Sequence, residues 1–332
     1  MSRITKLFRT AVFGALAVLA MGVFAAQAET KWDMSVVWPD GNFHTKNARA
    51  FAEMVNKATN GEVKITVHSG GSLGIKGPEG MVAVRDGLVP IADVLLNQQS
   101  GEAPIMGIES LPFLAPTSQK LALLHKFVRP VFERVAAEYN QKILYIVPWP
   151  GQAVYSKMKI DTIDDLDAFK LRVVDANGHD FFTKLGAAPL QLPWGEVVPS
   201  LAAGTIEGVT TSSSSGVDGK FWEFLGHMSR FNWQASSNMV SVNLDAWNAL
   251  PPEHRDAIEA LGKKVEAEFW LSSRREDGTK LKILAENGIE VSTPNAELRA
   301  ALVERARPLW DQFAERVPEA KQIIADYVEV IE

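Results

Sequence analysis

The chain has 332 residues, and 46% of them are hydrophobic. It contains no cysteine and has a formal net charge of −6 at pH 7. The lack of cysteine excludes a disulfide framework and a thiolate metal site, and a mildly acidic chain is a poor partner for the phosphate backbone of nucleic acid. The length and the hydrophobic fraction favour two domains, each with its own core.

The first 28 residues have the pattern of a cleavable signal peptide. Three cations precede an apolar run from residue 11 to 26, and Ala26-Gln27-Ala28 is the small-x-small sequence that signal peptidase recognises. The run is shorter than the about 20 apolar residues of a membrane-spanning helix, and no later segment is long enough. We expect residues 1–28 to be removed and the mature chain, with a net charge of −9, to work in the periplasm.

Strands and helices alternate in the first half of the mature chain. Alternating apolar residues predict strands over 32–36 and 63–67, and a nearly continuous apolar run predicts a buried strand over 91–96. Apolar residues at helical spacing predict a helix between residues 42 and 61, and a short helix ends near Gly87. This order is typical of an α/β protein with a mostly parallel sheet.

The alternation returns in the second half. Strands are predicted over 142–147, 170–174 and 206–210, and helices over 180–185 and 302–317. Pro252 opens a long helix with a polar face, which we expect to reach Gly288 with an interruption near Gly278. No flexible linker separates the halves, so we expect two lobes joined by short crossings, as in a hinged clamshell.

Enzyme and metal motifs are largely missing from the sequence. It has no His-Glu-x-x-His, no Walker loop, no Gly-x-Gly-x-x-Gly after a strand and no Gly-x-Ser-x-Gly. The six histidines do not have metal-ligand spacing, so we predict neither a metal site nor a cofactor. The run from Thr210 to Gly216 contains four serines, and we interpret it as a hydroxyl-lined loop after a strand.

Arg172 is the first candidate for binding a ligand. It alternates with Leu171 and Val173 in a predicted strand, so its side chain lies on the opposite face from theirs. A guanidinium there gives a carboxylate two parallel hydrogen bonds that lysine cannot supply. The alternative from the residues alone is a structural ion pair with a nearby acid such as Asp175.

An ordered set of short segments resembles a known family. The segments are Leu73-Gly74, Leu111-Pro112-Phe113-Leu114, Leu171-Arg172-Val173, Leu192-Pro193-Trp194-Gly195-Glu196-Val197, Ile206-Glu207-Gly208 and Phe221-Trp222-Glu223. Together they resemble the DctP-type solute-binding proteins, the receptors of tripartite ATP-independent periplasmic (TRAP) transporters. The resemblance implies two α/β lobes around a cleft, with a long helix bracing both. We expect the first lobe to comprise residues 29–149 and 237–276, and the second residues 150–236 and 277–332.

The resemblance also implies site residues and marks two departures from the family. The family's ligand-gripping arginine falls on Arg172, while Gln152 stands where many members carry a second arginine, and the family's asparagine falls near Thr211 and Ser212. The remaining candidates are four tryptophans at predicted cleft-facing loop ends: Trp38, Trp149, Trp194 and Trp233. Large apolar walls with one cation favour a ligand with one carboxylate and an apolar or aromatic body.

We therefore predict a periplasmic receptor, not an enzyme, that captures an organic acid and delivers it to the small and large permease subunits of a TRAP transporter. The alternatives are a receptor for an ABC importer, a receptor that signals to a sensor kinase, and a periplasmic hydrolase that uses the serine run and a histidine.

Overall fold

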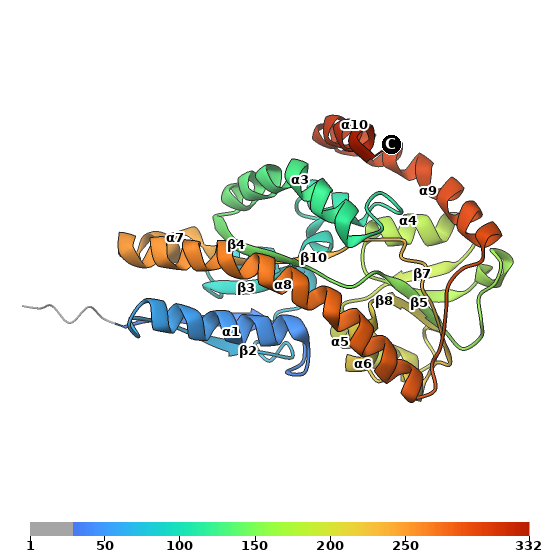
Figure 1. Cartoon of the computed structure of the whole chain (residues 1–332), viewed down its shortest axis with the longest axis horizontal. Coiled ribbons are helices and arrows are strands. Elements are labelled where there is room, and N and C mark those ends of the chain that lie inside the picture. The colour runs from blue at the N-terminus through green and yellow to red at the C-terminus, as the bar shows by residue number, and fades with distance from the viewer. Residues whose placement is uncertain (1–28, 332) are drawn as a thin grey trace, which may run out of the picture.

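The computed structural model describes residues 29–331, so the predicted signal peptide lies outside the described residues. Two β-sheets lie side by side, each flanked by helices (Figure 1). We call the body around the first sheet the first lobe, and the body around the other sheet the second lobe. The two-lobed α/β arrangement agrees with the prediction.

The first sheet has five strands and the second has six. In spatial order the first contains β2 (Val63–His68), β1 (Thr30–Val36), β3 (Ile91–Leu95), β10 (Ser237–Asn243) and β4 (Gln141–Pro148). The second contains β11 (Glu290–Ser292), β9 (His227–Ser229), β5 (Ala153–Ser156), β8 (Gly208–Thr211), β6 (Lys170–Val173) and β7 (Ala188–Gln191).

Helices follow the strands in both lobes. With the first sheet lie α1 (Phe43–Ala58), α2 (Gly80–Arg85), α3 (Ser118–Glu138), α7 (Leu244–Asn248) and the 3-10 turns η1 (Gly77–Glu79), η2 (Leu96–Gln99) and η3 (Pro104–Ser110). With the second lie α4 (Ala176–Lys184), α5 (Trp194–Ala202), α6 (Ser213–Asp218), α9 (Ala296–Arg316), η4 (Asp164–Leu166) and η5 (Phe221–Glu223). Two further helices contact elements of both lobes. They are α8 (Pro252–Glu286) and α10 (Pro318–Ile331).

Both sheets are mixed, so the prediction of a mostly parallel sheet needs correction. Strand β10 runs antiparallel to β3 and β4, and β5 runs antiparallel to β8 and β9. These are the strands that the chain enters directly after crossing between the lobes. The crossings lie side by side, because the Trp149 amide donates to the Ser236 carbonyl at 2.8 Å.

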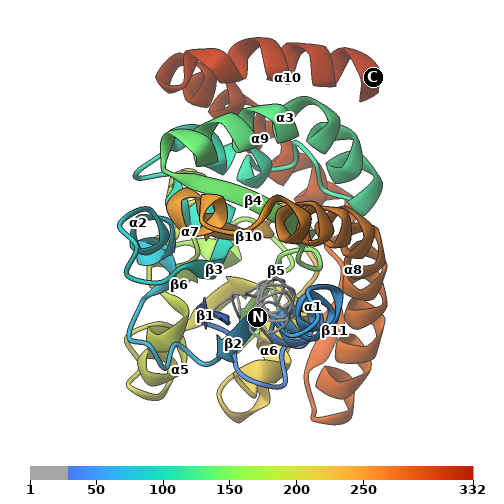
Figure 2. The ribbon, with the colours of Figure 1, turned by 90° about the vertical axis from the view of Figure 1, so that its left-hand side faces the viewer.

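The long helix α8 braces both lobes (Figures 1 and 2). It packs against α1 and β4 of the first lobe and against α6 and β11 of the second. At its closest approach a Cβ on Gly262 would lie 2.3 Å from the Leu144 carbonyl oxygen, so only glycine allows this contact. The predicted interruption near Gly278 is absent, because that residue faces open space and costs only about 1 kcal/mol of helix propensity.

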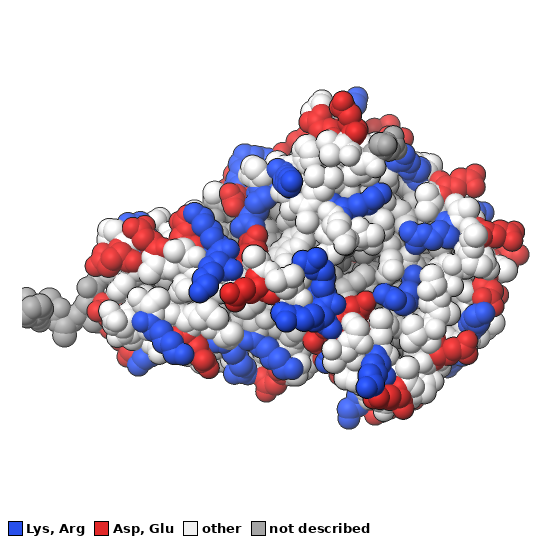
Figure 3. All heavy atoms as spheres, viewed as in Figure 1, with Lys and Arg blue, Asp and Glu red and all other residues white. Residues whose placement is uncertain are grey.

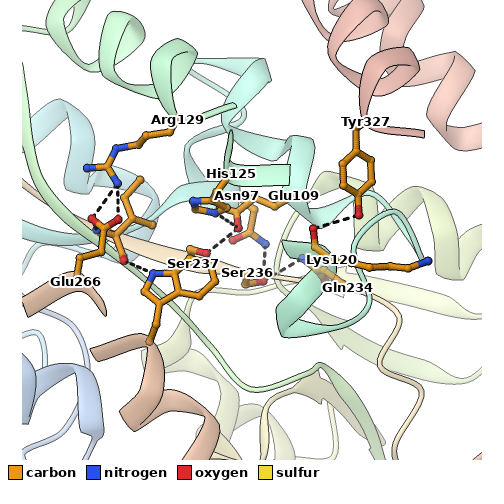
Figure 4. A network of polar contacts seen from close by, with 12 residues as sticks. Asn97, Glu109, Lys120, His125, Arg129, Gln234, Ser236, Ser237, Glu266 and Tyr327 are labelled. Atoms are coloured by element: carbon orange, nitrogen blue, oxygen red, sulfur yellow. Dashed lines mark hydrogen bonds and ion pairs between the residues drawn. The ribbon is translucent and has the colours of Figure 1, made fainter. Parts of the chain in front are cut away.

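Side chains of α8 also form hydrogen bonds with backbone groups of β4, at the edge of the first sheet. The Glu266 carboxylate accepts from the Ile146 amide at 2.8 Å, and the Trp270 indole donates to the Ile146 carbonyl at 2.9 Å. Glu266 in turn accepts two bonds from Arg129 of α3 (Figure 4). The helix is thereby tied to β4 just before the chain crosses to the second lobe.

The C-terminal helix corrects the predicted division of the lobes. Although residues 277–332 were assigned to the second lobe, α10 packs against α3 and η3 of the first. Its apolar face enters the core of the first lobe, and the Tyr327 hydroxyl donates to the carbonyls of Leu114 and Lys120 (Figure 4). Although α10 follows α9 directly in the sequence, burial of its apolar face places it with the first lobe.

Charges of both signs are interspersed over the face that α8 crosses (Figure 3). Among residues 29–331, no helix is long and apolar enough to cross a membrane.

Candidate functional site

A small cavity of about 20 Å³ lies between the lobes. It lies where β1, β3, β4, β6 and β8 end, the place where open α/β sheets bind ligands. Its walls combine residues of both lobes and of the two crossings: Trp38, Leu95, Trp149, Gln152, Arg172, Val174, Trp194, Thr211, Ser215 and Ser236. Six of the eight predicted site residues line this one cavity.

Arg172 is the only lysine or arginine that lines the cavity, and its side chain is 2% exposed. Its Nε and Nη2 donate to the Leu192 carbonyl at 3.0 and 2.8 Å, and its Nη1 donates to the Thr210 carbonyl at 3.3 Å. A guanidinium carries five N–H donors, so one N–H on each terminal nitrogen is left without an acceptor among the described residues. Burial lowers the pKa of Arg172 to about 10, and the side chain therefore stays cationic at neutral pH.

Asp175 is not the ion-pair partner of this cation. Its Oδ1 accepts from the Gly178 amide at 2.8 Å and caps the N-terminus of α4. Its Oδ2 accepts from Asn97 at 2.5 Å and from Gln234 at 2.9 Å. Among residues 29–331 no carboxylate lies within 4.0 Å of the Arg172 guanidinium, so the cation has no directly paired counterion there. The charge of Asp175 acts on it from farther away and raises the pKa of Arg172 against the effect of burial.

Three tryptophans form the apolar walls. The rings of Trp38 and Trp149 meet edge to face at 4.6 Å, and Trp194 of the second lobe lies 6.1 Å from Trp38. Trp38 and Trp149 are almost completely buried, and Trp194 is half-buried. Aromatic rings from both lobes thus converge on one side of the cationic group.

Gln152 and Thr211 line the cavity, whereas Ser212 does not. The Ser212 hydroxyl caps α6 by accepting from the Ser215 amide at 3.2 Å. The next residue of the run that reaches the cavity is Ser215 itself. Gln152 donates only a long 3.4 Å bond to the Pro150 carbonyl, so most of its amide remains available to a ligand.

Trp233 does not line the cavity, and its inclusion in the site needs correction. Its ring is 0% exposed and stacks on Phe181 at 5.4 Å, with Phe182 edge-on at 5.1 Å. It belongs to the core between the second sheet and α9. Trp233 lies in the segment that returns the chain to the first lobe, as expected. Its side chain, however, packs against Phe181 and Phe182 of α4 and not against the cavity.

Sequence reasoning missed four lining residues: Leu95, Val174, Ser215 and Ser236. Leu95 ends β3 and Val174 directly follows β6, so their position at the carboxyl end of a strand was an available signal. Ser215 and Ser236 reach the cavity through the cap of α6 and the return crossing. Neither residue has a local sequence signal for that placement.

A buried carboxyl group lies behind two of the tryptophans. Asp93 of β3 accepts from the Trp38 indole at 3.0 Å and from Asn238, which itself accepts from the Trp149 indole at 2.7 Å. Burial raises the pKa of Asp93 to about 7 against the two hydrogen bonds, which lower it. His44 lies 3.8 Å away, but burial holds its pKa well below the usual value, so the imidazole is neutral and the contact is not an ion pair.

Asp93→Asn is expected to stabilise the ligand-free protein at pH 8 and to stabilise it much less near pH 5. The unfolded carboxyl titrates near about 3.9, so the folded state retains its proton longer, and stability falls as the pH rises from about 4 to about 7. The asparagine removes this cost, which amounts to at most about 4 kcal/mol at pH 8. Thermal melts of both proteins from pH 5 to pH 8 measure it. Parallel curves throughout would contradict the assignment.

Polar contacts also join the lobes at the mouth of the cleft. Lys76 of the first lobe pairs with Glu196 of the second at 2.9 Å, and Asn42 donates to Asp218 at 2.6 Å. Beside this ion pair lies an outer hollow of about 490 Å³, which shares Trp194 with the inner cavity. The described conformation is therefore one in which the lobes touch across the cleft.

Among residues 29–331, no histidine is hydrogen-bonded to the serine run. The Ser213 hydroxyl donates to Asp277, and the Ser212 hydroxyl bonds to the hydroxyl and the amide of Ser215. Within residues 29–331, no group of three or more His, Asp or Glu side chains could hold a metal ion.

The family follows from comparison with known proteins. A model of the bacterial extracellular solute-binding proteins of family 7, DctP, matches residues 34–316. This chain belongs to that family. The match confirms the predicted DctP-type solute receptor and replaces the alternatives of an enzyme and of an ABC-type receptor.

Solved structures with the same two-lobed fold agree with the family. An extracytoplasmic solute receptor of Bordetella pertussis that binds pyroglutamic acid is 29% identical with a TM-score of 0.87, and the match covers 90% of this chain and 99% of that one. A marine metagenome TRAP solute-binding protein specific for pyroglutamate is 29% identical with a TM-score of 0.87, over 91% and 99% of the two chains.

A sequence relative at lower identity also spans the chain. The monocarboxylate 2-oxoacid-binding periplasmic protein of Nostoc sp. is 24% identical over 319 residues, which cover 91% of this chain and 84% of the relative. This chain is therefore a solute-binding receptor.

Proposed function

We propose that this family-7 receptor captures a compact monocarboxylate in the periplasm and delivers it to the permease subunits of a TRAP transporter. The observation that carries the proposal is the Arg172 guanidinium, buried without a carboxylate and with two free N–H donors beside three tryptophan rings. A ligand carboxylate would supply the missing counterion and acceptors together.

The cavity favours one carboxylate over two. A second carboxylate would need another cation, and Gln152 offers only an amide. The apolar walls are tryptophan, leucine and valine, which suit an apolar or flat body, and Thr211, Ser215 and Ser236 add hydroxyl groups. The pyroglutamate that two similar receptors bind has one carboxylate on a small ring, which supports this ligand class.

A thermal-shift screen is expected to favour pyroglutamate and other compact monocarboxylates over succinate. Each added carboxylate must be desolvated without a cation, so we expect a loss of about tenfold or more in affinity for the diacid. Calorimetry on the best acids gives the affinities.

The two lobes are expected to close on the ligand. Small-angle scattering should therefore show a smaller radius of gyration with ligand than without.

Two results would count against the proposal. A clear preference for C4 dicarboxylates would refute the assigned ligand class while leaving the receptor family intact. An unchanged radius of gyration at a saturating concentration of a confirmed ligand would refute the clamshell motion.

Export is expected to remove the first 28 residues. The basic segment and Ala26-Gln27-Ala28 direct cleavage after Ala28, so the intact mass of protein from the periplasmic fraction should correspond to a chain that begins at Glu29. The uncleaved precursor in that fraction would contradict cleavage after Ala28.

A further inference from the structure

Two first-lobe tryptophans of the cavity, Trp38 and Trp149, are tied together from behind. The indole of one donates to Asp93 at 3.0 Å, and the indole of the other donates to Asn238 at 2.7 Å. Asn238 also donates to the same Asp93 oxygen, so a single Asp–Asn pair closes the link between both rings. Both tying residues are buried, with exposures of 5% and 1%.

This link determines what the cavity presents to a ligand. An indole has one donor and no acceptor, and both donors of the two first-lobe tryptophans are consumed on the side of the sheet. These two tryptophans therefore offer the ligand ring surface and no hydrogen-bond donor. The edge-to-face contact at 4.6 Å between the rings depends on both ties, because each ring is fixed at its N–H edge.

We propose that Asp93 and Asn238 are positioning residues: they hold the two first-lobe tryptophans and thereby set the affinity and selectivity of the cavity. Neither residue lines the cavity, so both act through the rings. Preorganised walls save the cost of ordering side chains when the ligand binds. A freed indole N–H would also add a polar group to an otherwise apolar wall.

The test compares four variants of the mature protein. Asp93→Leu and Asn238→Leu remove the ties, while Asp93→Asn keeps an acceptor oxygen for both donors. Ser241→Ala is the matched control, because this buried residue of β10 loses a 2.7 Å bond to Gln141 that does not involve the tryptophans.

One readout is independent of the ligand. Two indoles in close edge-to-face contact give an exciton couplet in far-ultraviolet circular dichroism. The couplet should disappear in the two leucine variants and persist in Asp93→Asn and Ser241→Ala. Failure of a leucine variant to fold is detected by its melt, and Asp93→Asn against Asn238→Ser then provides the same comparison with smaller changes.

The second readout rests on the proposed carboxylate binding and uses pyroglutamate and succinate as probes. We expect the leucine variants to lose about tenfold or more in pyroglutamate affinity and part of the preference for pyroglutamate over succinate. Asp93→Asn should keep an affinity and a preference close to those of the wild type. Unchanged couplet and unchanged affinity in folded Asn238→Leu would overturn the inference. If the wild type binds neither probe, the proposed ligand class fails, and the couplet alone decides the positioning role.

Discussion

Arg172→Lys is expected to weaken binding of a compact carboxylate almost as much as Arg172→Ala. The guanidinium uses three of its N–H groups on the carbonyls of Leu192 and Thr210 and keeps one free on each terminal nitrogen. Lysine keeps the charge but cannot hold both carbonyls and a carboxylate in this planar geometry. A charge-assisted hydrogen bond contributes on the order of 1.5–3 kcal/mol, so each variant should lose roughly tenfold or more in affinity.

The burial of this cation adds a second expectation. Because desolvation lowers the pKa of Arg172 to about 10, the charged form is disfavoured in the ligand-free fold, and a bound carboxylate relieves that cost. Ligand should therefore raise the melting temperature strongly in the wild type and little in either variant. Calorimetry on folded protein measures the affinities. Arg230→Lys serves as the control, because that arginine pairs with Asp277 away from the cavity. Unchanged affinity in Arg172→Ala would refute the carboxylate anchor.

The fold was predictable from the sequence where the local hydrophobic pattern of a segment matches its burial in the folded protein. Strands β1 and β2 alternate and β3 is apolar except for Asp93, and α1 shows helical spacing with Asn42 as its cap, so the start of the first lobe was recognised within a few residues. Two helices contradict their local signals. Pro130 interrupts the pattern of α3, and α10 follows directly after α9, so neither was expected.

The mixed sheets were not readable from local sequence. The direction of β5 and β10 depends on how the two crossings return the chain to each lobe, and no residue in either strand encodes that. The crossings are short and lie against one another, held by the Trp149 to Ser236 backbone bond. That arrangement is a property of the assembled lobes.

The candidate site divides in the same way. Arg172, Trp38, Trp149 and Trp194 stand at strand or helix ends, where the family resemblance and the strand-end rule agree, and the structure brings them together. The network behind them was missed, because Asp93 and Asn238 lie far apart in the sequence and inside strands that read as ordinary core. Trp233 shows the converse error, since an aromatic residue near a crossing is more often core than wall.

Asp175→Ala is expected to lower the free energy of unfolding by about 2–4 kcal/mol and to reduce affinity far less than Arg172→Ala. The carboxylate caps α4 through the Gly178 amide, and loss of a cap costs about 1 kcal/mol. It also accepts from the buried amides of Asn97 and Gln234, and each donor left without a partner costs about 1–3 kcal/mol. Relaxation around the vacated position keeps the total below the sum of these losses.

Two further variants separate the roles of Asp175. Asp175→Asn keeps the acceptor of the cap but turns an amide group toward the Asn97 and Gln234 donors, so its stability should lie between wild type and alanine. Asp165→Ala is the matched control, because this carboxylate accepts backbone bonds from Asp161 and Thr162 at an exposed turn and should cost about 1 kcal/mol or less. Chemical denaturation gives the stabilities and calorimetry the affinities. Abolished binding at unchanged stability in Asp175→Ala would contradict the structural role assigned to Asp175.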